Sequence, residues 1–315
     1  MTQTLLLRII MAAIGSFMLF AALFSLPFAA LPVAYVGLAY GVSQAAMVAV
    51  AAALLTGVMI SPALAIIFTI MFLAPTLFLV RQALLSRRNA DGASFDFYPL
   101  ERIVLLALGM TGIATILVFS IFSGAENAGG MPQSFANAMA ASPEIKQALS
   151  QVYNLSSGAD MLRVANLIII TGFASWPLLL LGNLQIAQSL LVRFGKNLRP
   201  QVDYERMSLP VWLVALMLAL LVPVIIASGW VATLAATLAG LVLAAYFLLG
   251  LAIIHAISRP WNGRGLILGA LYFLIFVMAW VIIPVALMGL LDARFDFRGL
   301  NKSPDKPSET HGDEE

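Results

Sequence analysis

The feature that most limits what this chain can fold into is a run of 72 residues, Ile9–Val80, without Asp, Glu, Lys or Arg. Arg8 and Arg81 bracket this run. A soluble domain carries charged side chains over its whole surface, because such side chains are almost never fully buried. A charge at the centre of a bilayer costs about 2.5–3.5 kcal/mol on insertion scales, so membrane segments avoid it. The run therefore predicts a membrane-embedded chain.

Four further uncharged runs repeat the pattern: Ile103–Ala125, Val164–Val192, Met207–Ser258 and Gly265–Leu291. Each reaches or exceeds the roughly 20 residues with which a helix crosses the hydrocarbon core. The runs are continuously apolar, which is typical of helices, since a helix satisfies its backbone groups within the segment. We therefore expect an all-α protein, a polytopic transmembrane helix bundle.

Proline and glycine divide the bundle into eight to nine apolar segments, of which the second and third are short for spans. The segments are Leu5–Phe24, Pro27–Gly41, Ser43–Thr56, Ser61–Leu85, Ile103–Phe122, Arg163–Leu191, Pro210–Ala227, Trp230–Ile257 and Gly265–Leu290. We expect one membrane domain over residues 1–302, with a four-segment N-terminal half over residues 5–85. The Pro-rich and acidic residues 303–315 predict a disordered tail.

Lys and Arg in short loops predict the orientation, because such loops stay in the cytoplasm. Two loops are rich in Arg, the first basic loop (Arg81–Arg102) and the second basic loop (Arg193–Arg206), and the turn Arg259–Arg264 adds two more. We expect all three on the cytoplasmic side of a bacterial inner (plasma) membrane. The number of spans then places the C-terminal tail outside, although its Lys and Arg residues favour the cytoplasm.

Lys146 is the only basic residue in the connection 123–162, so we expect this connection on the outer face. Ser142-Pro143-Glu144 predicts a helix start, and apolar residues then recur at helical spacing. The prediction is an amphipathic helix over residues 143–154. It either covers the ends of the bundle or forms a lid over a substrate site.

The chain lacks the residues of common membrane-enzyme chemistry. It has no cysteine, and Gly195-Lys196-Asn197 lacks the remaining residues of a phosphate-binding loop. No acid lies inside an apolar run, and His255 is the single histidine near a predicted span. We expect no enzyme, no cofactor and no metal site, with His255 in a structural role. The net charge is only +2 and the basic residues lie in short loops, so the expected partner is the lipid bilayer rather than nucleic acid.

Polar candidates remain at two places. Asn183, Gln185 and Gln188 lie in the last turns before Arg193, where amides either join helices or line a substrate-binding cavity. Ala12 and Ser16 are small residues at four-residue spacing on the first predicted helix. Such a face allows close packing, either inside the bundle or against a partner subunit.

A set of short patterns marks a family resemblance. The patterns are Tyr98-Pro99, Asn183-Leu184 with Ala187, Arg199-Pro200, Leu209-Pro210, and Gly289-Leu290-Leu291-Asp292 followed by Asp296-Phe297-Arg298. In this order they resemble the YybS-like family of multi-pass bacterial membrane proteins, a domain without an assigned activity. The opening, residues 5–85, is more distantly similar to substrate-binding (S) subunits of energy-coupling-factor transporters. In those subunits a small-residue face on the first helix docks a coupling subunit, a role that the resemblance gives to Ala12 and Ser16. Three segments after Arg206 exceed the number in such a subunit.

Two functions fit the sequence. The first is a substrate-binding or transport component for a small solute, energised by a partner, since the chain lacks a phosphate-binding loop. The alternative is a non-transport membrane scaffold, or an accessory factor in envelope assembly.

Overall fold

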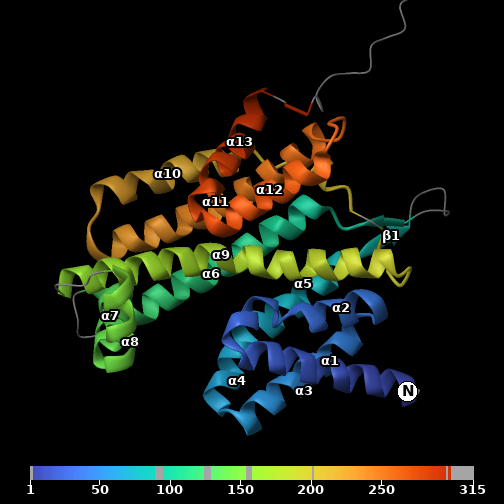
Figure 1. The fold of residues 1–315 in the computed structure, drawn as a ribbon, viewed down its shortest axis with the longest axis horizontal. Helices are drawn as coiled ribbons and strands as arrows, with labels where there is room; N and C mark the ends of the chain where they lie inside the picture. Colours follow the sequence, from blue (N-terminus) through green and yellow to red (C-terminus); the bar gives the residue numbers. More distant parts are fainter. Residues whose placement is uncertain are drawn as a thin grey trace, which may run out of the picture. The chain divides into compact units, whose positions relative to one another are not determined.

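The protein, seen in a computed structural model, is almost entirely helical, as its uncharged runs predict (Figure 1). The structure describes residues 3–88, 95–123, 129–153, 158–200, 202–295 and 297–298. The tail predicted over residues 303–315 lies outside these ranges. Contacts divide the chain into a first unit, Met1–Tyr204 with Ser208–Ala245, and a second unit, Glu205–Met207 with Tyr246–Glu315. The single membrane domain over residues 1–302 stays a prediction.

The N-terminal half contains seven helical elements. They are α1 (Gln3–Ala21), the 3-10 helix η1 (Leu23–Phe28), α2 (Leu31–Tyr40), α3 (Val42–Met59), α4 (Pro62–Phe68), the π-helical turn η2 (Thr69–Leu73) and α5 (Ala74–Leu84). The first basic loop then forms an antiparallel hairpin of β1 (Ser86–Arg88) and β2 (Phe95–Phe97), with Arg87 opposite Asp96.

The remaining elements are helical. They are α6 (Leu100–Ser123), α7 (Gly130–Ala141), α8 (Pro143–Tyr153), α9 (Gly158–Arg193), η3 (Tyr204–Arg206), α10 (Trp212–Ile226), α11 (Gly229–Ile257), α12 (Arg264–Val277), η4 (Ala279–Val281) and α13 (Ile282–Phe295).

Within the described ranges, six helical stretches are long and apolar enough to cross a membrane, or seven if the bent pair α12–α13 is one span. They are α1, α3, α4 to α5, α6, α9 and α11. The predicted count of eight to nine is not confirmed, because the stretch Ser25–Tyr40 and α10 are shorter. The third segment is longer than predicted, since α3 has 18 residues and passes through Gly57. A helix tolerates an interior glycine at a cost of about 1 kcal/mol, so Gly57 does not end it.

The last predicted segment, Gly265–Leu290, is not one straight helix. The chain bends by 119° between α12 and α13. Pro284 provides the physical reason: it has no backbone N–H, and its ring would clash with the carbonyl four residues earlier in a continuing helix. The structure instead places Pro284 in the first turn of α13, where N–H groups have no helical partner in any case.

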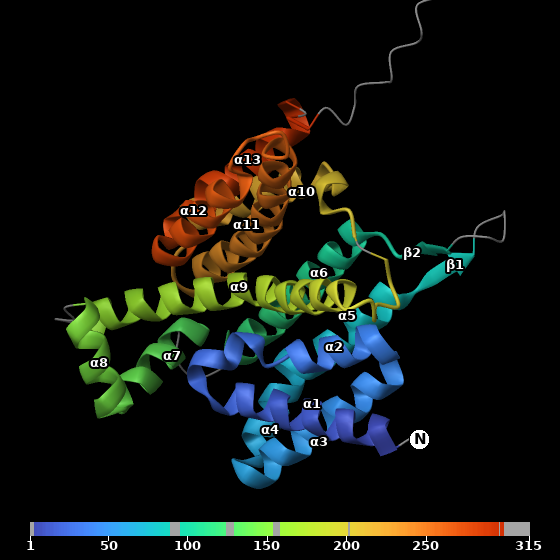
Figure 2. The ribbon, with the colours of Figure 1, turned by 45° about the vertical axis from the view of Figure 1, so that its right-hand side comes forward.

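The core of the N-terminal half lies where α1, α2 and α3 pack together, and Figure 2 shows these helices side by side. Phe68 is fully buried, and its ring stacks on that of Phe20 with centroids 4.1 Å apart. Helix α2 also packs on α9, which joins this half to the rest of the first unit. These contacts position the polar residues of α9 against η1 and α2.

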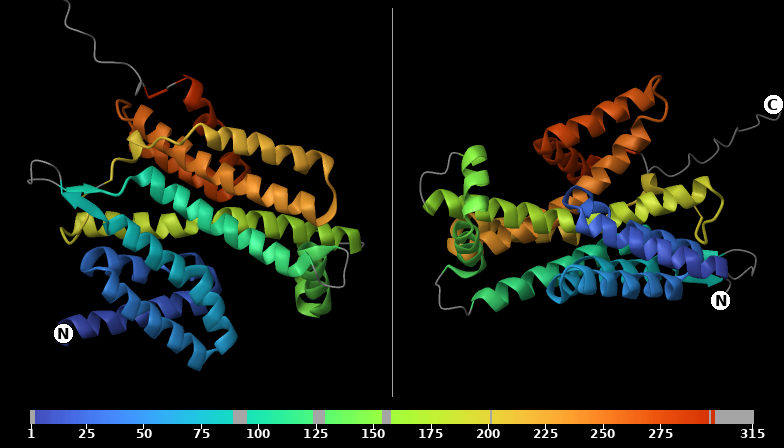
Figure 3. Two further views of the ribbon diagram at one scale, coloured as in Figure 1. Left: turned by 180° about the vertical axis from the view of Figure 1, so that it is seen from behind. Right: turned by 60° about the horizontal axis from the view of Figure 1, so that its bottom comes forward.

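Helices α6 and α9 run alongside each other, with α7 and α8 near the end of α6 that is remote from the β-hairpin (Figure 3). We did not predict α7, whose Ala136 and Met139 pack on Met161 and Ala165 of α9. The described part of the predicted 143–154 helix is α8, and none of its residues is buried. Its Glu144 carboxylate accepts hydrogen bonds from a backbone N–H and from the Ser142 hydroxyl, which lowers the pKa of Glu144.

In the second unit, α11 and α13 approach each other closely at two glycines. A Cβ atom on Gly250 would lie 1.9 Å from the carbonyl oxygen of Val285. A Cβ atom on Gly289 would lie 2.1 Å from the carbonyl oxygen of Tyr246. Only glycine fits either position, so the two helices pack backbone against backbone.

Candidate functional site

The first unit holds a π-helical turn that a distant side chain stabilises. In a regular α-helix the N–H of residue 75 would donate to the carbonyl of Met71, but Pro75 has no N–H. The indole Nε1–H of Trp176 donates to this carbonyl instead, at 2.7 Å. Trp176 is buried in α9, so this bond fixes α9 against η2. Buried polar backbone at membrane depth requires such a partner.

Asn183, a predicted substrate-binding residue, lies at a second irregular segment. Its Nδ2 donates to the carbonyl of Pro27 in η1 at 2.7 Å and to Leu179 of its own helix at 2.6 Å. Asn183 is only 2% exposed, and its Oδ1 has no hydrogen-bond partner. The amide therefore ties α9 to η1 and still has a buried, unused acceptor.

Gln185 and Gln188 follow Asn183 in α9. The Nε2 of Gln188 donates to the carbonyls of Arg199 at 2.8 Å and Pro200 at 3.2 Å, so Gln188 holds the second basic loop. Its Oε1, and that of the half-buried Gln185, have no partner. Asn183 and Gln188 thus hold different segments, and the structure spreads the three predicted residues along α9.

Thr76 of α5 belongs with these residues, although we did not predict it. It is fully buried, and its hydroxyl has no partner. Among the described residues, the other five buried threonines each donate to the carbonyl four residues earlier: Thr56, Thr111, Thr115, Thr233 and Thr237. For Thr76 that carbonyl belongs to Phe72, inside the π-helical turn. The signal in the sequence was Pro75, which marks an irregular turn before Thr76.

The predicted docking face of Ala12 and Ser16 points into the N-terminal half. Ser16 is fully buried, and its hydroxyl donates to the carbonyl of Ala29. Ala12 is partly buried against the same core. This face therefore packs inside the first unit, and its use by a partner subunit stays a prediction.

An open pocket of about 540 Å³ lies between the two basic loops. Arg199 forms part of its wall, and the Arg199 guanidinium donates to the carbonyls of Ala83 at 3.1 Å and Tyr98 at 2.9 Å. Burial lowers the pKa of Arg199, and burial raises the pKa of Tyr204 to about 12 despite the nearby Arg199 charge. Tyr98-Pro99 and Arg199-Pro200, two patterns of the resemblance, thus meet at this pocket. We had assigned neither pattern a role.

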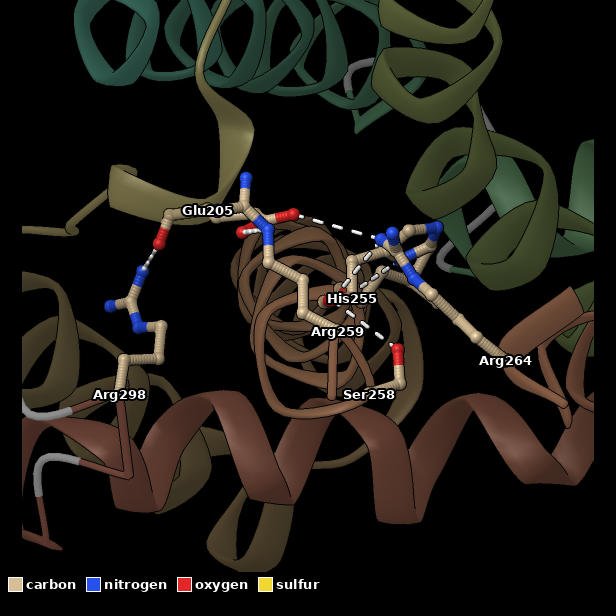
Figure 4. Close-up of polar contacts among 7 residues, drawn as sticks. Glu205, His255, Ser258, Arg259, Arg264 and Arg298 are labelled. Atoms are coloured by element: carbon tan, nitrogen blue, oxygen red, sulfur yellow. Dashed lines mark hydrogen bonds and ion pairs between the residues drawn. The ribbon is translucent and has the colours of Figure 1, made fainter. Parts of the chain in front are cut away.

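The second unit contains a polar cluster at the turn between α11 and α12 (Figure 4). The Glu205 carboxylate contacts Arg259 at 2.5 Å and Arg264 at 3.7 Å. Arg264 also donates to the carbonyl of His255 at 3.2 Å. The His255 ring contacts the carbonyl of Leu251 through Nδ1, at 2.9 Å, and the hydroxyl of Tyr272 through Nε2, at 3.4 Å. These contacts agree with the expected structural role of His255, which stays a prediction.

Asp292 and Arg298 form a buried ion pair in the same unit. Their side chains are 7% and 4% exposed, and the Nη2–Oδ2 distance is 2.6 Å. Arg298 Nη1 also donates to the carbonyls of Glu205 and Met207, each at 2.7 Å. Arg298 thus lies beside the end of the second basic loop. The side of the membrane on which the C-terminal tail lies stays a prediction, because the bent α12–α13 pair is either one span or a re-entrant segment.

A comparison with known families places the chain. The family described as "Predicted membrane protein (DUF2232)" matches residues 5–293. The chain belongs to this family. No curated protein and no solved structure matches this DUF2232 protein. The multi-span membrane protein that we expected is therefore shown, while the YybS-like and S-subunit resemblances stay predictions. Among the described residues, no three His, Asp or Glu side chains are grouped as a metal site would require.

Proposed function

We propose that this DUF2232 protein is the solute-binding membrane component of a transport system in the bacterial inner membrane, and that a partner supplies the energy. The proposal assigns the chain no catalysis of its own. The observation that carries it is the buried, unpaired Oδ1 of Asn183, next to the irregular segment at Pro27. A buried acceptor without a partner costs about 1–3 kcal/mol, and a solute that donates a hydrogen bond would recover this.

The surrounding helices support a binding role. Solutes in secondary transporters bind where helices are discontinuous, because irregular backbone at membrane depth occurs where protein or a cavity surrounds it. In the first unit the chain is irregular at η1 and at η2, and α9 contacts both through Asn183 and Trp176. The unpaired hydroxyl of Thr76 follows the second irregular turn. The resemblance to S subunits that the sequence predicts for residues 5–85 agrees with an energising partner.

The binding test uses the full chain purified in mild detergent, with bound small molecules identified by native mass spectrometry. Asn183→Leu should lose the solute while remaining monodisperse. Asn166→Leu is the matched control, because Asn166 also lies on α9 but its Oδ1 already accepts from Thr233 at 2.9 Å. If Asn183→Leu does not fold, Thr76→Val replaces it, since that change keeps the side-chain shape. Equal solute retention in all variants contradicts the proposal.

A scaffold in envelope assembly is the second candidate, and the hydrogen bonds that the same amides donate favour it. The Nδ2 of Asn183 and the Nε2 of Gln188 each hold a separate segment against α9, which is how a rigid scaffold uses buried amides. Purification of the wild type without solute, coupling subunit or ATPase would support the scaffold and oppose transport.

A further inference from the structure

The arginines of the second unit differ in how many of their donors are used. Each guanidinium nitrogen of Arg298 has a partner, with bonds to Asp292, Glu205 and Met207. Arg264 differs, because its Nε is buried and has no partner. Arg259 contacts Glu205 through Nε, and its side chain is 62% exposed. Arg259 and Arg264 therefore retain hydrogen-bond donors at the α11–α12 turn.

The start of α12 adds a further donor at the same place. Its N-cap is Gly263, with φ 84°, and no side chain caps the helix. The first N–H groups of a helix lack helical partners and, with the helix dipole, attract anions. The N–H groups of Arg264 and Leu266 already donate to the carbonyls of Trp261 at 3.3 Å and Gly263 at 2.9 Å, which leaves the N–H of Gly265. There is also room, since a Cβ atom on Gly263 or Gly265 would have no neighbour within 4 Å. The first turn of α12 thus faces open space.

One oxyanion already contacts this site. The Glu205 carboxylate lies between Arg259 and Arg264, which shows that their guanidiniums converge on a group of this charge. One carboxylate against two guanidiniums leaves a charge of +1. Guanidinium groups match phosphate oxygens through paired N–H donors. A second oxyanion with several oxygens would complete the arrangement.

We propose that Arg259, Arg264 and the first turn of α12 bind a phosphate-bearing group. The group comes either from an anionic lipid headgroup or from a free phosphate compound. Trp261, in the same turn and 48% exposed, fits a position at the headgroup level, where indole side chains concentrate. Basic residues next to a membrane helix are attracted to anionic lipids. This site is separate from the solute site proposed at Asn183, so each can fail alone.

The test measures two probes on the full chain. The first is retention of phosphatidylglycerol over phosphatidylcholine, from nanodiscs that contain both, by native mass spectrometry. The second is the shift of the thermal midpoint by inorganic phosphate, against chloride at equal ionic strength. Retention without a phosphate shift identifies a lipid headgroup, and a phosphate shift without retention identifies a free phosphate compound. The absence of both overturns the proposal.

The variants change affinity in opposite directions. The double change Arg259→Gln with Arg264→Gln should weaken binding about tenfold or more, since charge-assisted bonds are lost. Glu205→Gln should strengthen it several-fold, because it removes the competing carboxylate while the backbone carbonyl still meets Arg298. Arg163→Gln is the matched control, since Arg163 also pairs with a carboxylate, Asp160 at 3.6 Å, in the first unit. If the double variant does not fold, Glu205→Gln alone decides, and unchanged binding in it overturns the proposal.

Discussion

The indole nitrogen of Trp176 lies 2.7 Å from the carbonyl oxygen of Met71, a residue 105 positions earlier in the chain. Trp176→Phe keeps most of the ring but leaves this part-buried carbonyl without a donor. We expect the free energy of unfolding to fall by about 1–3 kcal/mol, the cost of an unsatisfied buried polar group. Denaturant titration in mixed micelles measures this.

A second change separates the loss of this hydrogen bond from a general change in packing. Pro75→Ala restores an N–H that can donate to the Met71 carbonyl. In the Trp176→Phe background it should therefore recover part of the lost stability, giving a non-additive double-mutant cycle. Strict additivity of the two changes would show that the indole bond and Pro75 are unrelated.

Thr76 gives a prediction of the opposite sign. Its hydroxyl is buried without a partner, so Thr76→Val should raise stability in the absence of solute by about 1 kcal/mol. Thr56→Val is the control, because the Thr56 hydroxyl donates to Ala52 at 2.9 Å and its loss should not stabilise the protein. Equal effects at both positions would contradict an unused hydroxyl at Thr76. Thermal unfolding of the purified variants compares them.

The glycines between α11 and α13 should not tolerate alanine. Gly250→Ala and Gly289→Ala each place a Cβ atom about 2 Å from a backbone oxygen, so the helices must separate. We expect a loss of at least about 3 kcal/mol, or failure to fold. Gly269→Ala, in α12, is the matched control: no atom lies within 4 Å of its Cβ position, and alanine favours helix by up to about 1 kcal/mol.

The Asp292–Arg298 pair should behave as one unit. Asp292→Asn or Arg298→Gln leaves a buried charge without its partner, which typically costs about 3–5 kcal/mol. Asp292→Leu combined with Arg298→Met should cost less than the sum of the single changes. It should still destabilise the protein, because the carbonyls of Glu205 and Met207 lose their donor. Unfolding titrations of the single and double variants measure the coupling.

The same pair predicts the topology of the C-terminus. Arg298 contacts the end of the second basic loop, so a reporter fused after Glu315 should be on the side of that loop. A second reporter placed in the loop, after Lys196, provides the internal reference. Opposite sides for the two reporters would contradict the contact.

Tyr204 predicts a pH dependence. Burial raises its pKa to about 12, whereas an unfolded tyrosine ionises near about pH 10. A raised pKa means that the folded state binds the proton more tightly, so this contribution to stability is full below pH 10. It is lost as the pH rises from about 10 to about 12. Absorbance at 295 nm should show one tyrosine ionisation fewer near pH 12 in Tyr204→Phe than in the wild type.

Much of the fold follows from local patterns. The absence of charge between Arg8 and Arg81 predicts membrane helices, and the Ser142-Pro143-Glu144 start coincides with the beginning of α8. The predicted helix ends were wrong where proline and glycine were not distinguished by their effect on the helix. Gly57 was interpreted as a helix end and is interior, whereas Pro284 was passed over and lies at the bend. A glycine lowers helix stability without preventing the helix, but a proline removes a bond.

The candidate site was predicted less completely. Asn183 and Gln188 were recognisable because amides in an apolar run need partners. Which partners they have depends on Pro27 and Arg199, and the first of these is 156 positions away. In the sequence Thr76 cannot be told from the other threonines of the uncharged runs, because it differs from them only in the structure, by one missing hydrogen bond. The phosphate site was visible only as two arginines in a turn.

Local patterns along the chain predict the membrane environment, the helical class and most helix positions. These follow from the cost of charge in lipid and from backbone hydrogen bonds made within each segment. Only the tertiary structure shows which polar group bonds to which carbonyl, where the chain bends between α12 and α13, and which donors and acceptors stay unused. The reason is physical: a helix sets its own hydrogen bonds over four residues, but Trp176 and Met71 meet only when packing brings α9 against η2.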